Sequence, residues 1–294
     1  MIKRKAIRKI FITTLSMFII LTIYTIPNTY KNNNVLRTNL EIEDITNLST
    51  DSIYLINKDN YLVKTDIFID SNKLEDKIKK IINYLTIDNN KVPLGLNGYI
   101  PKDIKLIDFN IEANSLVLNF SKEFKDNEEI IITGIVYSML EIDEINEVSF
   151  LVENKPYKNY NNLNKDIGIN KDILYTKRKD IEKIVVYYLD KTDNYYVPVT
   201  KYLNNNKEKI EVILEELKNT KKDLISYINY NTELLDYSEE ANLLILNFSK
   251  DIKDDNKDSF DKVLNTISYS VFDNYDVNMV MFKIEGETYK YIKR

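Results

Sequence analysis

The chain has 294 residues, contains neither cysteine nor histidine, and carries a formal net charge of −5. The two missing residue types exclude disulfides, thiolate nucleophiles, Cys/His zinc sites and histidine-based triads. A basic cluster stands at the start, so the remainder is more acidic still, and we expect neither a nucleic-acid partner nor a cofactor.

Residues 1–9 hold this basic cluster, and residues 10–26 follow as an apolar run without a charge. As a helix this run is about 25 Å long, near the lower limit for crossing a bilayer core. No small-residue cleavage site follows it, so we interpret it as an uncleaved transmembrane signal anchor, with a cleaved signal peptide as the alternative. Because basic flanks stay in the cytoplasm, the anchor predicts a single-pass protein of the cell membrane with an extracytoplasmic body.

The rest of the chain reads as a polar stalk followed by two copies of one domain. The segment LVLNFSKEFKD at 116–126 returns as LILNFSKDIKD at 244–254, which is 128 positions later (244 − 116). A repeat of this length is typical of a domain and too long for a solenoid unit. We therefore predict a stalk at residues 27–50, a first domain at 51–157, an Asn- and Lys-rich linker at 158–180 and a second domain at 181–292.

Each copy alternates between helix and strand patterns in the same order. In the first copy, apolar residues recur at helical spacing around 74–85 and 131–140, with strand patterns between and after them. The second copy repeats this order, with helical stripes around 210–217 and 260–272. Each stripe has to be buried, which favours an α+β fold: a mostly antiparallel sheet of three to five strands with two helices on one face.

Two further features carry a family resemblance. A proline turn, Ile100-Pro101, precedes the repeated segment, and Asn-Phe-Ser-Lys stands at 119–122 and again at 247–250. Together with the order of strands and helices, these features resemble the GerMN domain family of sporulation and spore germination proteins, in two tandem copies. The second copy lacks the proline turn and has Asn-Tyr-Asn-Thr at 229–232 instead.

The resemblance implies a fold similar to ring-building modules, and a non-catalytic scaffold outside the membrane. Its partners would be other envelope or sporulation proteins, or further copies of the chain. The resemblance also implies that the family's structural positions are Pro101, Phe120, Ser121, Phe248 and Ser249, and that the chain has no catalytic, cofactor-binding or metal-binding residues.

Ser121 and Ser249 raise the alternative of a serine nucleophile. Such a serine needs an adjacent base and a third group that orients the base, and only Lys122 and Lys250 stand nearby in sequence. We therefore expect each serine to close its strand through local backbone hydrogen bonds, next to a phenylalanine in the core.

Asp254, Asn256 and Asp258 raise the alternative of a calcium loop, because they occupy positions 1, 3 and 5 of an EF-hand. However, Ser259 stands where such a loop needs glycine, and Asn265 stands where it needs glutamate. We expect these residues to mark the start of a helix, where negative charge is favourable.

Clustered carboxylates raise the alternative of a wall hydrolase, which needs two carboxyl groups across a cleft. These clusters do not recur at matching places in the two copies, so we interpret them as solvated surface; they are Asp143, Glu144 and Glu147, and Glu239 and Glu240. The second choice of function is a glycan-binding module. Some tyrosines could stack on glycans or form protein contacts, such as Tyr187, Tyr188, Tyr195 and Tyr196. The favoured interpretation remains a membrane-anchored, extracytoplasmic, non-enzymatic scaffold.

Overall fold

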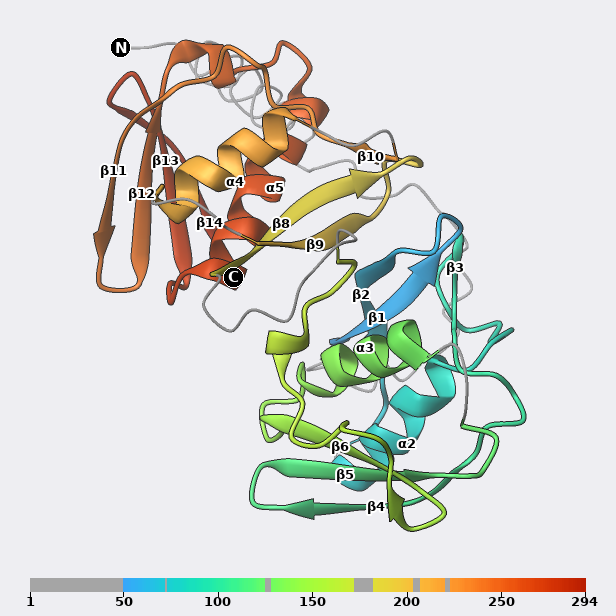
Figure 1. Ribbon diagram of the computed structural model, residues 1–294. Helices are drawn as coiled ribbons and strands as arrows, with labels where there is room; N and C mark the ends of the chain where they lie inside the picture. The colour runs from blue at the N-terminus through green and yellow to red at the C-terminus, as the bar shows by residue number, and fades with distance from the viewer. Residues whose placement is uncertain (1–49, 72, 125–127, 172–181, 203–206, 220–222) are drawn as a thin grey trace, which may run out of the picture. The chain divides into compact units, whose positions relative to one another are not determined.

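The computed structural model describes residues 50–294 except residues 72, 125–127, 172–181, 203–206 and 220–222 (Figure 1). The described residues belong to one compact unit, Leu48–Arg294. The basic segment, the apolar run at 10–26 and almost all of the stalk lie outside the described residues. Among the residues that the structure describes, no helix has both the length and the apolar composition needed to cross a membrane.

The described residues of the first domain form two sheets and two α-helices. Its three-stranded antiparallel sheet has the order β2-β1-β3, and its four-stranded sheet has the order β4-β5-β6-β7, with β5 and β6 parallel. The elements are β1 (Thr50–Asn57), β2 (Leu62–Phe68), α2 (Leu74–Tyr84), β3 (Leu96–Asn97), β4 (Leu106–Glu112), β5 (Ser115–Phe120), α3 (Glu128–Met139), β6 (Glu147–Val152) and β7 (Lys155–Pro156).

The second domain repeats this topology in the yellow-to-red half of Figure 1. Its three-stranded sheet has the order β10-β8-β9, and its four-stranded sheet has the order β11-β12-β13-β14, with β12 and β13 parallel. The elements are β8 (Lys183–Asp190), β9 (Tyr196–Tyr202), α4 (Lys209–Lys218), β10 (Leu224–Ile225), β11 (Leu234–Glu240), β12 (Leu243–Phe248), the 3-10 turn η2 (Lys250–Ile252), α5 (Lys257–Asn274), β13 (Met279–Ile284) and β14 (Glu287–Lys293).

The α+β fold with two repeated domains is confirmed, but each domain has two sheets where we expected one. The reason lies in helix α3, which contacts both β1 and β6 and is apolar nearly all round. A helix of this kind has to be buried on every side, which one sheet cannot do. Helix α2 has a narrower stripe, formed by Ile78, Ile81 and Ile82, and needs only one covered face.

The described part of the expected linker is ordered against the first domain. The backbone of β6 pairs with it, since the amide of Phe150 donates to the carbonyl of Tyr160 at 2.9 Å, and Val148 and Leu163 exchange hydrogen bonds of 2.8 and 2.9 Å. Strand β7 has only two residues and leaves most of this edge of β6 unpaired. Buried backbone groups need partners, and the segment after β7 supplies them. It continues through the 3-10 turn η1 (Lys165–Ile167) towards the second domain.

Candidate functional site

The motif phenylalanines lie in the two cores. Phe120 and Phe248 are completely buried, and each stacks on a phenylalanine of the neighbouring parallel strand, Phe150 or Phe282, with ring centroids 6.3 Å apart in both domains. Pro101 is partly exposed in the turn before β4, where its carbonyl oxygen accepts a backbone hydrogen bond. These residues hold the fold and present no reactive group.

The motif serines are tied to backbone in the same way in both domains. The hydroxyl oxygen of Ser121 accepts from the amide of Lys105 at 3.1 Å, and that of Ser249 accepts from the amide of Glu233 at 3.1 Å. The serine amides donate back to the carbonyls of the same two residues, each at 2.9 Å. Each serine therefore fastens the end of β5 or β12 to the residue just before the neighbouring strand, β4 or β11, and neither is arranged as a nucleophile.

The acidic stretch before α5 begins a helix. The side chain of Asn256 accepts from the amides of Asp258 and Ser259 at 3.0 and 3.4 Å, as a helix N-cap does. Asp254 accepts from the amide of Asn256 at 2.9 Å, so these residues serve the turn and the helix start. Within the described part of the chain, no group of three or more acidic side chains is placed to hold a metal ion.

The acidic clusters lie at the surface. Asp143, Glu144, Glu239 and Glu240 are exposed, and Glu147 is partly exposed. They stand in a turn, at the start of β6 and on edge strand β11, and none faces a carboxylate partner across one of the described clefts.

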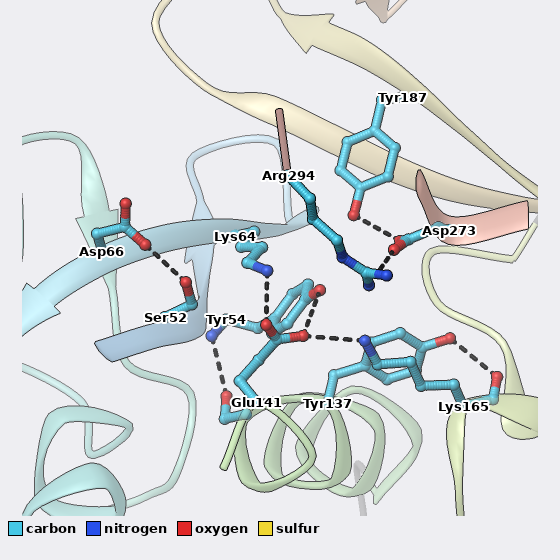
Figure 2. A network of polar contacts seen from close by, with 11 residues as sticks. Ser52, Tyr54, Lys64, Asp66, Tyr137, Glu141, Lys165, Tyr187, Asp273 and Arg294 are labelled. Carbon is cyan, nitrogen blue, oxygen red and sulfur yellow. Dashed lines mark hydrogen bonds and ion pairs between the residues drawn. The ribbon is translucent and has the colours of Figure 1, made fainter. Parts of the chain in front are cut away.

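A polar cluster that the sequence did not point to lies where helix α3 ends beside β1 (Figure 2). The amide of Tyr54 donates to the hydroxyl of Ser138 at 2.9 Å, and the phenol of Tyr54 donates to Glu141 at 3.5 Å. Glu141 also pairs with Lys64 at 2.5 Å and with Lys165 at 3.0 Å. Burial acts to raise the pKa of Glu141, but the charges of Lys165 and Lys64 outweigh it and hold this pKa below its ordinary value. We call Tyr54, Ser138 and Glu141 the first Tyr–Ser–acid unit.

The second domain contains the same unit at equivalent positions of β8 and α5. The amide of Tyr187 donates to the hydroxyl of Ser270 at 2.9 Å, and its phenol donates to Asp273 at 2.7 Å. Arg294 lies 3.8 Å from Asp273, in the place that the lysines take in the first domain. We call Tyr187, Ser270 and Asp273 the second Tyr–Ser–acid unit.

The two units face each other across the domain boundary (Figure 2). Burial raises the pKa of Tyr54 well above its ordinary value, and the charges of Glu141 and of Asp273, from the other domain, raise it further. Burial likewise raises the pKa of Tyr187, and the charge of Asp273 and the neighbouring Tyr54 raise it further. Equivalent residues meet in this way at an isologous interface, in which one surface patch contacts its own copy.

Asn170 joins the edge strands of the two three-stranded sheets, β2 and β9, which lie next to each other. Its side chain donates to the carbonyls of Leu62 and Pro198 at 2.7 and 2.8 Å, and accepts from the amide of Leu62 at 2.9 Å. The preceding residue, Ile169, exchanges hydrogen bonds with Thr200 at 2.8 and 2.9 Å. The chain between the domains thus supplies the bonds that the two strand edges do not make directly.

The chemistry of this junction is that of positioning. Burial keeps the phenols of Tyr54 and Tyr187 protonated, and two lysines balance the charge of Glu141. None of these groups is therefore set up to take a proton from a substrate or to give one. What the junction can do is hold two copies of one domain at a defined separation. The sequence did not reveal it because Tyr54 and Glu141 are 87 residues apart. The tyrosines at 54 and 187 correspond only when β1 and β8 are aligned through their ends, Asn57 and Asp190, and not at the spacing of the repeated segment.

Fold and junction together define a class of protein, a fused pair of α+β domains that pack through equivalent surfaces. A family model described as "Germane: Sporulation and spore germination" matches residues 52–158 and 185–290. These segments make up more than half of the chain, and the chain belongs to this family, which confirms the resemblance seen in the sequence.

Two comparisons extend this result. The "Spore germination protein GerM" of Bacillus subtilis (strain 168) is 24% identical over 270 residues, which cover 80% of this chain and 71% of that protein. A solved structure titled "Tandem GerMN domains of the sporulation protein GerM from Bacillus subtilis" matches with a TM-score of 0.72 at 21% identity, over 84% of this chain and 96% of that one. This likeness shows that the tandem-domain fold is shared.

Proposed function

We propose that this protein is a non-enzymatic scaffold of sporulation or spore germination, in which the two domains act as one binding platform. Residues 10–26 would anchor it in the cell membrane, and the basic residues 1–9 favour an extracytoplasmic position for both domains. Membership of the sporulation and spore germination family supports the setting. The lack of histidine and cysteine, and the backbone-bound state of Ser121 and Ser249, support a role without catalysis.

The observation that carries this proposal is the contact between the two Tyr–Ser–acid units. Tyr54 and Tyr187 are both buried at the domain boundary, so the two domains pack against each other and do not move independently. A partner that touches both domains would meet surfaces already fixed in position. Preorganised surfaces lose less freedom on binding, which favours affinity. The partners would be other envelope or sporulation proteins, or further copies of this chain.

Cross-linking in sporulating cells, followed by identification of the captured proteins, tests the scaffold role. The decisive variant is Glu141→Ala combined with Asp273→Ala, which loosens the junction from both sides. Its matched control is Glu239→Ala combined with Glu240→Ala, two acids on the exposed strand β11. We expect the control to capture the same proteins as the unmodified chain and the junction variant to lose most of them. Unchanged capture by a folded junction variant would contradict the platform.

Protease treatment of intact protoplasts tests the anchor. We expect both domains to be digested from outside while a short amino-terminal piece stays with the membrane. Release of a soluble protein shortened at its amino terminus would show cleavage instead and remove the anchor from the proposal.

A further inference from the structure

A cleft of about 470 Å³ opens beside the domain junction, with walls from both domains. The first domain contributes Ser52, Lys64 and Asp66, and the second contributes Tyr196, Tyr269 and Arg294. Its size lies within the range of about 300–1,000 Å³ that is usual for small-ligand sites, and such sites often form between domains. Nothing in the scaffold role requires an open cleft at this position.

The wall from the second domain is aromatic. Tyr269 projects from the buried middle of helix α5 and is 39% exposed. Its ring is supported by Tyr196, with centroids 4.8 Å apart and planes at 76°, and by Tyr187, with centroids 5.6 Å apart. A ring held by two neighbours offers a rigid, flat and partly apolar surface to a ligand.

Both cations of the cleft have an acidic partner, whereas the carboxylate of Asp66 accepts from a hydroxyl. Lys64 pairs with Glu141, and Arg294 lies near Asp273. The hydroxyl of Ser52 donates to Asp66 at 2.6 Å (Figure 2). Burial raises the pKa of both Tyr196 and Tyr269, so their phenols stay neutral donors. The cleft therefore offers paired cations and one carboxylate that can accept from hydroxyl groups, which fits a neutral ligand rich in hydroxyls better than an anion.

We propose that this cleft binds a neutral saccharide, with one sugar ring stacked on Tyr269 and its hydroxyl groups bonded to Asp66 and Ser52. A pyranose ring has an apolar face of C–H groups and a rim of hydroxyls, which matches an aromatic wall beside paired polar groups. The open side leaves room for the sugar to be part of a longer glycan chain. This binding activity goes beyond the scaffold role and does not depend on it.

The test is calorimetric titration of the full chain, in detergent, with a linear tetramer of N-acetylglucosamine. We expect Tyr269→Ala to weaken binding about tenfold or more, which corresponds to about 1.4 kcal/mol. Tyr269→Phe keeps the ring and should bind within about threefold of the unmodified protein, as expected for a stacking contact. The control is Tyr230→Ala, which removes a tyrosine that is 74% exposed and does not line the cleft.

Three results would overturn the proposal: no binding of the tetramer at millimolar concentration, equal losses in Tyr269→Ala and Tyr230→Ala, or binding of a neutral peptide in place of the sugar. Cross-linking of Tyr269→Ala in sporulating cells separates the two functions. We expect its partner capture to be unchanged, so a failure of sugar binding leaves the scaffold proposal standing.

Discussion

The two domains of this chain keep the same junction residues and differ at their outer strands. Both have a tyrosine bonded to a serine and an acid, with amide-to-hydroxyl distances of 2.9 Å in each. The four-stranded sheet of the first domain ends in the two-residue β7, whereas that of the second ends in the seven-residue β14. In this duplicated protein the surfaces that meet each other have stayed alike, while the outer edges have diverged.

The hairpins β1–β2 and β8–β9 also keep one hydrogen-bonding pattern in both domains while the residue type changes. Asn57 ends β1 and accepts from the amides of Asp59 and Tyr61 at 3.1 and 2.9 Å. Asp190 ends β8 and accepts from the amides of Asn194 and Tyr195 at 3.1 and 3.2 Å. The side-chain oxygen is the functional group in both turns, so asparagine and aspartate are interchangeable there.

The largest expected effect comes from the core phenylalanines. Phe120→Ala and Phe248→Ala should each lower the free energy of unfolding by about 3–5 kcal/mol, because each leaves a cavity in a closed core. Phe120→Ala should lower the free energy of unfolding more than Phe248→Ala, because Phe120 also stacks on Phe124, with ring centroids 4.5 Å apart. Denaturant unfolding of the two variants measures the difference. A loss below about 1 kcal/mol in either would show that the core closes over the gap.

Removing the junction acids one at a time compares the two Tyr–Ser–acid units directly. Glu141→Ala should lower the free energy of unfolding by about 2–3 kcal/mol, less than a fully buried pair would, because its lysine partners are partly exposed. Asp273→Ala should lower the free energy of unfolding by less, because Asp273 has a weaker ion pair, with Arg294 at 3.8 Å. Denaturant midpoints of both variants decide the order, and a reversed order would mean that the hydrogen bond from Tyr187 outweighs the ion pairs.

The bridge between the sheets should have a smaller effect. Asn170→Ala removes three hydrogen bonds across the boundary of β2 and β9, for a loss of about 1–3 kcal/mol. Asn170→Asp keeps the acceptor for the amide of Leu62 but has no N–H for the carbonyls of Leu62 and Pro198, and brings a negative charge beside them, so it should lose at least as much stability. Amide hydrogen exchange at Leu62 reports the opening, and unchanged protection in Asn170→Ala would show that the domains dock without the bridge.

The smallest effect is a dependence on pH that belongs to the first domain. The pKa of Glu141 is lowered in the folded chain, so its stabilising contribution is present above the ordinary value of 4.5 and is lost as pH falls through the folded value. Unfolding midpoints measured downward from pH 5 should therefore fall less steeply in Glu141→Gln than in the unmodified chain. Parallel curves for the two proteins would contradict this assignment.

Several features followed from local sequence alone. The repeat at 116–126 and 244–254 established two domains, because a strand with Phe120 or Phe248 on its inner face needs a core of its own. The acidic residues Asp254 and Asp258 predicted the start of α5 through the helix dipole, and the structure adds that Asn256 caps this helix. For Ser121 and Ser249 the sequence predicted bonding to backbone, but the side-chain partners are not local: they are the amides of Lys105 and Glu233, 16 residues earlier in the chain.

Only the tertiary structure decided how the strands divide and how the copies meet. The split into two sheets depends on α3 being covered from both sides. At Gly134 of that helix Tyr99 packs so closely that a Cβ would lie 2.3 Å from its ring. Tyr54 and Glu141 come together over 87 residues, and Asn170 and Leu62 over 108. Periodicity reports what a segment buries, not what it is buried against, so contacts of this range are settled only when the whole chain packs.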